Sequence, residues 1–180
     1  MMCETYGITR AQCDAFAARS HARAVSAATN GHFTAEVVGL EGQDKDGATV
    51  WHDADEGIRA GTTEAKLATL ETLVQQGFCP PPEKCPEGRI TAGNASQVSD
   101  GAAAVLIANE AGLKKLGNVT PLARIHTLAL AGTDPVLMLS APIPATEKAL
   151  KRAGLAMDDI DLYEVNEAFA CVPLAWEKEL

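Results

Sequence analysis

A polar pair at the end of an apolar run is the first place in this sequence that could do chemistry. Asn166 and Glu167 directly follow the strand-like residues 161–165, and a helix-like segment follows at once. The ends of strands in α/β sheets can hold polar side chains against a ligand crevice. Asn166 and Glu167 are therefore candidates for contact with a ligand, and a helix N-cap is the alternative role of Asn166.

A second polar stretch, residues 91–101 (TAGNASQVSDG), has the composition of a loop that a ligand could approach. Its small residues leave the backbone accessible, and Asn94, Ser96 and Ser99 offer hydrogen bonds. It is not a phosphate-binding loop, because it lacks both glycine patterns that such loops use. From the residues alone, a structural turn and a binding turn are equally well supported.

The elements that position these two stretches are predicted from periodicity and capping signals. Thr9 and Gln12 have capping-box spacing, and the apolar stripe that follows predicts a helix ending at Asn30-Gly31. His21 lies within this helix and is interpreted as an ordinary solvated or packed residue. The next predicted elements are a hairpin and a second helix, at residues 35–40 with 48–52 and at residues 62–73.

After an irregular, proline-rich loop at 77–88, predicted strands and helices alternate to the end of the chain. The predicted strands are residues 101–108, 122–131 and 161–165, and the predicted helices are residues 109–117, 144–154 and 167–180. Such alternation favours an α/β fold with a parallel or mixed sheet covered by helices.

The composition argues against several classes of function. The 180 residues suffice for one domain or parts of two, and 15 basic against 24 acidic side chains give a formal net charge of −9. This charge disfavours nonspecific binding to nucleic acid or to an anionic membrane. We expect no membrane span and no signal peptide, because no apolar run is long enough. Five cysteines without framework spacing favour a reducing, cytoplasmic setting.

Two groups of potential metal ligands carry little weight. Cys79 and Cys85 lie in the proline-rich loop without nearby histidines, and their spacing is wider than structural zinc sites favour. The acidic run at 53–56 lacks a recognisable loop pattern of oxygen ligands. We expect no metal site, and zinc or a hard cation at these positions are the minor alternatives.

Taken together, the two polar stretches resemble motifs of the thiolase family. The run TAGNASQVSDGAAAVLIA is similar to the family's pantetheine-side loop and following strand, and YEVNEAFA to its Asn-Glu-Ala-Phe signature. Four flanking stretches agree in order and spacing: ITRAQCDAFAARSHARA, DADEGIRAGTTEAKL, LARIHTLALAGTDP and APIPATEKALKRAGL. The resemblance covers essentially the whole chain.

The resemblance implies an α/β fold of the thiolase type, with five αβαβα layers, two similar halves and an inserted loop region that covers coenzyme A. Only part of that fold is expected here. Residues 1–98 would form the loop region of the N-terminal domain, residues 99–119 the closing strand and helix of that half, and residues 120–180 the beginning of the C-terminal domain.

The activity that the resemblance implies is acyl transfer between coenzyme A thioesters. Thiolases cleave 3-ketoacyl-CoA by thiolysis or join acyl-CoA units by Claisen condensation, with a cysteine thiolate as nucleophile. Coenzyme A is then a substrate, and no resident cofactor is implied. The family also implies a homo-oligomer as the full-length protein, with neither nucleic acid nor membrane as a partner.

The resemblance assigns roles to eight residues of this chain. Asn166 matches the asparagine that fixes a water in an oxyanion hole, and Glu167 matches a residue that supports it. The others match substrate contacts, along the coenzyme A nucleotide (Arg59), along pantetheine (Ala92, Ala95 and Ser96) and in the acyl pocket (Met138 and Phe169). For Arg59 and Met138, a surface arginine and a core methionine are equally well supported.

The chain also departs from the family pattern. None of its cysteines lies in the nucleophile motif, the family's Gly-His-Pro segment has no counterpart, and Cys171 stands where a small packing residue suffices. Leu139 and Ala141 replace the usual glycines near Met138. We therefore expect an internal segment of a thiolase that is inactive alone and exposes apolar residues at 102–108.

Two alternatives remain open from the sequence. One is a non-catalytic module that binds coenzyme A or is completed by a separately encoded partner. The other is a condensing ketoacyl synthase. This alternative is less well supported, because those enzymes share the fold but usually carry histidine where Asn166 stands.

Overall fold

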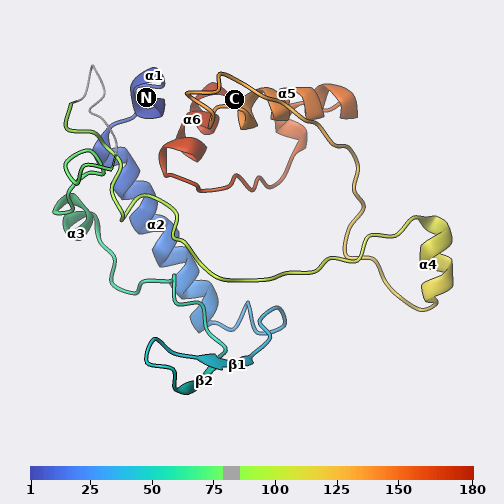
Figure 1. Ribbon diagram of the computed structural model, residues 1–180. Coiled ribbons are helices and arrows are strands. Elements are labelled where there is room, and N and C mark those ends of the chain that lie inside the picture. The colour runs from blue at the N-terminus through green and yellow to red at the C-terminus, as the bar shows by residue number, and fades with distance from the viewer. Residues whose placement is uncertain (79–85) are drawn as a thin grey trace. The chain divides into compact units, whose positions relative to one another are not determined.

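The computed structural model describes residues 1–78 and 86–180 of the chain (Figure 1). The chain divides into two compact units. The first unit combines residues 1–97 with residues 165–179, and the second consists of residues 98–164 together with Leu180.

The first unit contains the 20-residue helix α2 (Arg10–Thr29), which begins at the predicted capping box. The hydroxyl oxygen of Thr9 accepts the N–H of Gln12 at 3.2 Å, and the side-chain oxygen of Gln12 accepts the N–H of Thr9 at 2.8 Å. Two backbone donors at the helix start are satisfied in this way. The helix ends at Asn30, and Gly31 follows with φ of 74°. The prediction of this helix is confirmed.

The core of the first unit involves α2 and two shorter helices that contact each other, α1 (Met2–Thr5) and α6 (Cys171–Glu179). Its buried apolar side chains are Met2, Cys3, Ile8, Cys13, Ala17, Leu67, Ala170, Cys171, Val172 and Ala175. The guanidinium of Arg89 donates to the carbonyl oxygens of Cys3 and Ile8, at 2.9 and 2.6 Å. These bonds fasten the N-terminal residues to the core.

The predicted hairpin is present, but its first strand is displaced. Strand β1 (Leu40–Gln43) pairs antiparallel with β2 (Thr49–His52). The prediction of a strand at 35–40 is wrong, because Val37 N–H donates to the carbonyl oxygen of Phe33 in a turn. The carboxylate of Asp44 accepts the N–H groups of residues 46 and 48 and closes a tight loop. This loop sets the register between β1 and β2, and the polar residues Glu41 and Gln43 therefore belong to β1.

The second predicted helix is shorter than residues 62–73. Helix α3 (Glu64–Ala68) begins after the predicted threonine cap, where the hydroxyl of Thr63 accepts the N–H of Lys66 at 3.3 Å. The chain then leaves the helix, because Leu73 N–H donates to the carbonyl oxygen of Ile90 at 2.8 Å. Pairing with a distant segment therefore replaces further helical hydrogen bonds.

The second unit has two helices that the sequence predicts. Helix α4 (Glu110–Leu116) starts at Asn109, whose side chain accepts the N–H of Gly112 at 2.8 Å. Helix α5 (Pro142–Ala153) starts at Pro142 rather than Pro144 and ends at Ala153, one residue before the predicted end, where Gly154 follows with φ of 70°. The short 3-10 helix η1 (Met157–Asp159) follows.

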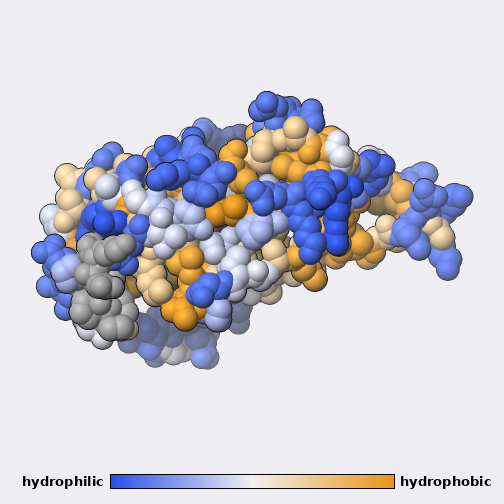
Figure 2. Space-filling view, turned by 90° about the horizontal axis from the view of Figure 1, so that it is seen from above, coloured by the Kyte–Doolittle hydropathy of each residue, from blue (hydrophilic) through white to orange (hydrophobic). Residues whose placement is uncertain are grey.

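The strands predicted at 101–108, 122–131 and 161–165 are not formed, since none of these segments pairs with another strand in the described part of the chain. A strand needs a neighbour to take up its N–H and C=O groups. Residues 105–107 instead expose 71 to 84% of their surface, which confirms the expectation of exposed apolar residues there. Apolar side chains reach the surface of the molecule in Figure 2.

The C-terminal part of one predicted strand, residues 122–131, is held by side chains instead of by a sheet. In the second unit, Lys148 donates to the carbonyl oxygen of Leu130 at 2.8 Å, and Arg152 to that of Leu128 at 2.7 Å. None of the helices in the described ranges is long and apolar enough to cross a membrane.

The capping box gives a direct test of α2. Replacing Thr9 with alanine removes the acceptor for Gln12 N–H and should lower the free energy of unfolding by about 1 kcal/mol. Thr9→Ser keeps the hydroxyl and should lose much less. Urea unfolding followed by circular dichroism measures both variants. Equal losses for alanine and serine would contradict the capping role of the hydroxyl.

Candidate functional site

The two polar stretches singled out in the sequence lie side by side in the first unit. We call residues 91–97 the polar loop and residues 165–170 the Asn166 segment. Ala95 and Phe169 form an isolated antiparallel bridge. Next to it, Ser96 N–H donates to the carbonyl oxygen of residue 168, and the N–H of residue 170 donates to that of residue 94, both at 2.9 Å.

This pairing changes where the last helix begins. The predicted helix from Glu167 is wrong in its start, because α6 begins at Cys171. The backbone groups at 168 and 170 bond to the polar loop and are unavailable for a first helical turn there. Asn166 is therefore not the N-cap of this helix, and its side chain is exposed.

Glu167 attaches the Asn166 segment to α2. The hydroxyl of Ser20 donates to the carboxylate of Glu167 at 2.7 Å, across 147 positions of sequence. Phe169 is half-buried in the bridge. The supporting role of Glu167 stays a prediction.

The polar loop is a tight turn with a buried side. Thr91 is fully buried, and its N–H donates to the side-chain oxygen of Asn94 at 2.9 Å. A Cβ on Gly93 would lie 2.4 Å from a methyl carbon of Leu67, so only glycine fits without a shift. On the other side, Ala92 and Ser96 are exposed and Ala95 is half-buried. The small predicted contact residues therefore line the accessible side of the turn.

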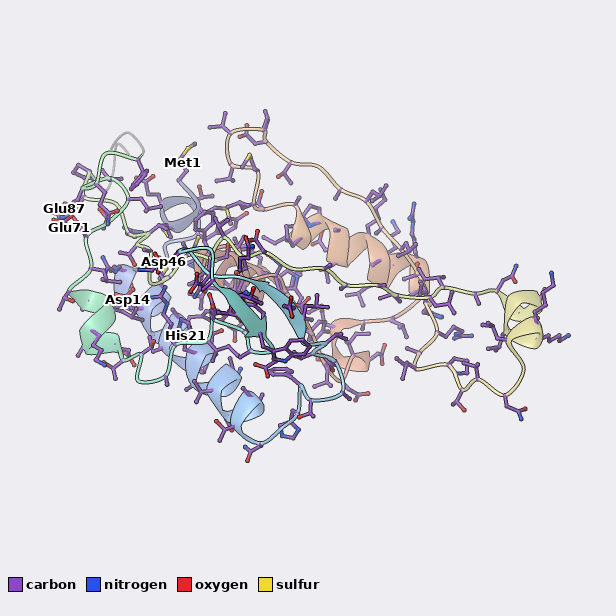
Figure 3. The ribbon with its side chains drawn as sticks, turned by 60° about the horizontal axis from the view of Figure 1, so that its bottom comes forward. Met1, Asp14, His21, Asp46, Glu71 and Glu87 are labelled. Carbon is purple, nitrogen blue, oxygen red and sulfur yellow. The ribbon has the colours of Figure 1, made fainter. Side chains whose placement is uncertain are left out.

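Arg59 belongs to the same unit, and its backbone is fixed while its side chain is exposed. Its N–H donates to Nδ1 of His21 on α2 at 3.3 Å, and its carbonyl oxygen accepts from Thr62 at 2.9 Å. Gln97 of the polar loop donates to the carbonyl oxygen of Gly57, two residues before Arg59, at 2.8 Å. Figure 3 shows His21 on α2. The sequence did not predict this contact of His21.

Met138 belongs to the second unit and is 61% exposed. It has φ of 49°, the one positive value at a non-glycine residue in the ranges that the structure describes. Its N–H donates to the carbonyl oxygen of Asp134 at 2.8 Å. The left-handed conformation is sterically costly for a residue with a Cβ. The acyl-pocket role of Met138 stays a prediction.

Three cysteines from different helices, Cys3, Cys13 and Cys171, are buried in the core of the first unit. The thiols of Cys13 and Cys171 both hydrogen-bond to that of Cys3, which lowers the pKa of Cys3, and Arg89 acts in the same direction. The hydrogen bond with Cys3 and burial raise the pKa of Cys13 and of Cys171. Cys171 thus packs in the core, as predicted.

The residues that the structure describes include no group of His, Cys, Asp and Glu side chains arranged to hold a metal ion. Within the acidic run 53–56, Asp55 accepts the N–H of Gly57 at 2.7 Å in a turn. Cys79 and Cys85 lie outside the described residues.

Comparison with known proteins places both units in one family. A family model described as "Thiolase, N-terminal domain" matches residues 1–111, and one described as "Thiolase, C-terminal domain" matches residues 119–180. A 3-ketoacyl-CoA thiolase of Aeromonas hydrophila is 48% identical over 180 residues, which are 100% of this chain and 44% of that protein. The chain thus spans less than half the length of this relative.

Solved structures agree with the sequence match. The Bacillus anthracis acetyl-CoA acetyltransferase superposes with a TM-score of 0.84 at 38% identity, over 99% of this chain and 42% of that one. The human mitochondrial 3-ketoacyl-CoA thiolase superposes with a TM-score of 0.83 at 42% identity, over 98% and 42% of the two chains. The predicted fold class, a partial thiolase-like α/β fold, is confirmed.

The buried cysteines predict a pH dependence of stability. In the unfolded chain a thiol ionises above about pH 8.5, whereas the raised pKa keeps Cys13 and Cys171 neutral when folded. The free energy of unfolding should therefore fall above that pH, by about 1.4 kcal/mol per pH unit for each thiol. Cys3 does not oppose this fall, because its lowered pKa leaves it ionised in both states there.

Urea unfolding between about pH 8 and pH 10 measures this slope. The matched control is the double variant Cys13→Ala, Cys171→Ala, in which the slope should be clearly shallower. The same slope in both proteins would show that the two buried thiols do not cause the fall.

Proposed function

The chain belongs to the thiolase family, and we propose that it acts within an acyl-CoA acyltransferase that cleaves 3-ketoacyl-CoA by thiolysis or condenses acyl-CoA units. The observation that carries this proposal is the pairing of the polar loop with the Asn166 segment. It brings the proposed substrate contacts Ala95 and Ser96 next to the backbone that holds the proposed catalytic amide. Relatives named 3-ketoacyl-CoA thiolase and acetyl-CoA acetyltransferase support the reaction class.

In this proposal Asn166 stabilises the negative charge that develops on the thioester oxygen. Its amide orients a water, and that water donates a hydrogen bond to the oxygen as the carbonyl becomes tetrahedral. An amide suits this role because it donates and accepts at once and stays neutral. The bridge at Phe169 and the bond from Ser20 to Glu167 hold the segment in place, so little reorganisation is needed during the reaction.

The nucleophile of the proposed reaction comes from outside the described residues. Cys3, Cys13 and Cys171 are buried in the core, so none of them presents a thiol at the surface where Asn166 lies. Covalent thiolase chemistry needs a thiolate within reach of the thioester carbon. The described residues of this chain would therefore supply the oxyanion water and part of the substrate surface, and not the attacking sulfur.

Coenzyme A acts as a substrate in the proposal, and we propose no resident cofactor. The exposed small residues of the polar loop would let the pantetheine arm approach the backbone. The exposed guanidinium of Arg59 would attract a phosphate and stack on a base at the nucleotide end. Phe169 is proposed to contact the acyl group of the substrate. The same role is proposed separately for Met138.

We make further proposals on the domain boundaries, the cellular location, the oligomeric state and the partners. We propose the domain boundaries at residues 98 and 119, a cytoplasmic homo-oligomer, and neither nucleic acid nor membrane as a partner. The net charge of −9 supports the last point. A second candidate function, a coenzyme-A-binding module completed by a separate polypeptide, is favoured by the exposed apolar residues 105–107.

A chimera tests the proposed reaction. Residues 1–180 replace the matching segment of the Aeromonas hydrophila relative, which supplies the remaining thiolase residues. We expect thiolysis of a 3-ketoacyl-CoA, and Asn166→Ala should lower kcat by about 100- to 1,000-fold because one oxyanion stabiliser is lost. Asn118→Ala, an exposed asparagine of the second unit, is the matched control and should have no effect.

The outcomes separate the two candidate functions. Full activity of the Asn166→Ala chimera would exclude the oxyanion role of Asn166. A folded chimera that binds coenzyme A but catalyses no thiolysis would favour the non-catalytic module.

A further inference from the structure

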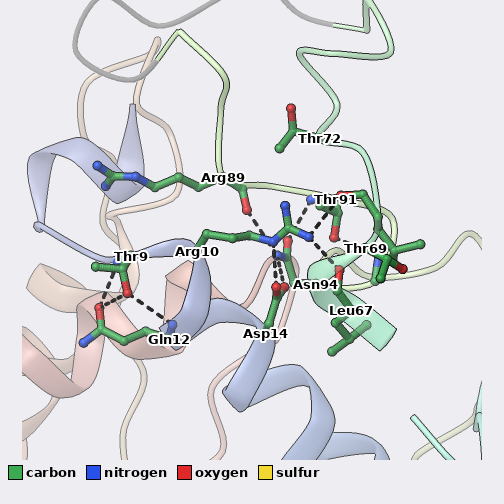
Figure 4. Close-up of polar contacts among 12 residues, drawn as sticks. Thr9, Arg10, Gln12, Asp14, Leu67, Thr69, Thr72, Arg89, Thr91 and Asn94 are labelled. Carbon is green, nitrogen blue, oxygen red and sulfur yellow. Dashed lines mark hydrogen bonds and ion pairs between the residues drawn. The ribbon is translucent and has the colours of Figure 1, made fainter. Parts of the chain in front are cut away.

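A buried charge lies directly behind the polar loop, on the side away from its exposed small residues. Asp14 on α2 and Asn94 in the loop each expose only 3% of their surface. Neither residue figures among the positions with an assigned role in catalysis or binding. Figure 3 shows Asp14 on α2, and Figure 4 shows its contacts.

Asp14 links α2 directly to the polar loop, and through Arg10 to α3. Arg10 Nε donates to one oxygen at 2.7 Å, and the side-chain amide of Asn94 donates to the other at 2.9 Å. The same arginine donates to the carbonyl oxygens of Leu67 and Leu70, at 2.7 and 3.1 Å. The carboxylate is thus neutralised by α2 itself and fixed relative to α3 and the residues that follow it (Figure 4).

Asn94 uses every hydrogen-bonding group of its side chain. Its oxygen accepts the N–H of Thr91 at 2.9 Å, and its two amide hydrogens go to Asp14 at 2.9 Å and to the carbonyl oxygen of Arg89 at 3.2 Å. The backbone carbonyl oxygen of Asn94 accepts the N–H of Ala170 at 2.9 Å. The residue therefore links the buried carboxylate to the Asn166 segment in two steps.

The coupling follows from the cost of burying charge. A buried carboxylate is tolerated only while its oxygens are paired and hydrogen-bonded. If Asn94 moved, one oxygen of Asp14 would lose its amide partner without gaining water. The loop and the carbonyl oxygen that holds Ala170 are thereby confined to one position.

We propose that Asp14 and Asn94 are positioning residues for the Asn166 site. Asp14 is fixed by Arg10 and orients Asn94, and the backbone carbonyl oxygen of Asn94 holds the Asn166 segment. The consequence for catalysis rests on the proposed thiolase function. The positional part concerns this chain alone and can be measured without any activity.

An exchange of the two side chains separates positioning from simple stabilisation. Asp14→Asn places an amide donor against the amide of Asn94, and Asn94→Asp places two carboxylates against each other. The double variant restores one donor and one acceptor with the direction reversed. It loses the bond to the carbonyl oxygen of Arg89, the longest of the three, and the direct ion pair between Arg10 and position 14.

Amide hydrogen exchange of the 180-residue chain gives the first readout. We expect exchange at Ser96 and Ala170 to rise at least tenfold in each single variant, relative to amides in the second half of α2. The double variant should exchange more slowly than either single variant, because a donor and an acceptor face each other again. Should Asp14→Asn fail to fold, Asn94→Ser takes its place. This variant keeps the backbone carbonyl that accepts the N–H of Ala170 and removes the side-chain amide that bonds to Asp14.

A uniform rise across α2, Ser96 and Ala170 would overturn the proposal, because it would reveal general destabilisation. So would a double variant that exchanges as fast as the single ones.

Kinetics of the chimera give the second readout. Asp14→Asn should lower kcat about tenfold with a smaller change in KM, since Asn166 acts in the transition state, and the double variant should recover part of this loss. Faster exchange at Ala170 with unchanged kcat would overturn the catalytic part. An inactive parent chimera would instead count against the thiolase function, and the exchange experiment would then decide the positioning role alone.

Discussion

Asp14 receives one hydrogen bond on each carboxylate oxygen, from Arg10 and from Asn94, and is almost wholly removed from water. Segments far apart in the sequence meet at this carboxylate. Arg10 extends the network to the carbonyl groups after α3, and Asn94 extends it to Ala170. An unpaired buried charge costs several kcal/mol, so the geometry of the polar loop and of the Asn166 segment depends on this contact.

The predictions from sequence were right where the signal is local. The capping box at Thr9 and the stop at Asn30-Gly31 act within a few residues of themselves, and both ends of α2 are found as expected. The predictions failed where a partner elsewhere in the chain decides. Residues 101–108 have the composition of a strand but no strand beside them, and α6 starts late because its predicted first turn pairs with the polar loop.

The candidate site shows the same division. Ala95, Ser96 and Phe169 were selected from motifs, and the structure brings them together. Asp14 was missed, although its spacing of four from Arg10 on a helix was a readable signal of an ion pair. What no local pattern could indicate is that the carboxylate faces Asn94, eighty residues away.

Family membership and geometry support the proposed function in different ways. The match to both thiolase domains points to acyl transfer on coenzyme A thioesters, while the chain spans 44% of the length of the Aeromonas hydrophila relative. In the structure, one backbone pairing joins the polar loop to the Asn166 segment. The polar loop is proposed to contact pantetheine, and the Asn166 segment is proposed to hold the oxyanion water. In the proposed function, a change in that pairing would affect substrate binding and catalysis together.

The pairing itself is tested most directly by nuclear magnetic resonance of the 180-residue chain. Ala95 and Phe169 form the type of antiparallel pair without mutual hydrogen bonds, in which the two Cα atoms lie roughly 4.5 Å apart. We expect a strong nuclear Overhauser effect between their Hα protons. Absence of this effect, with both resonances assigned and α2 intact, would show that the two segments do not pair.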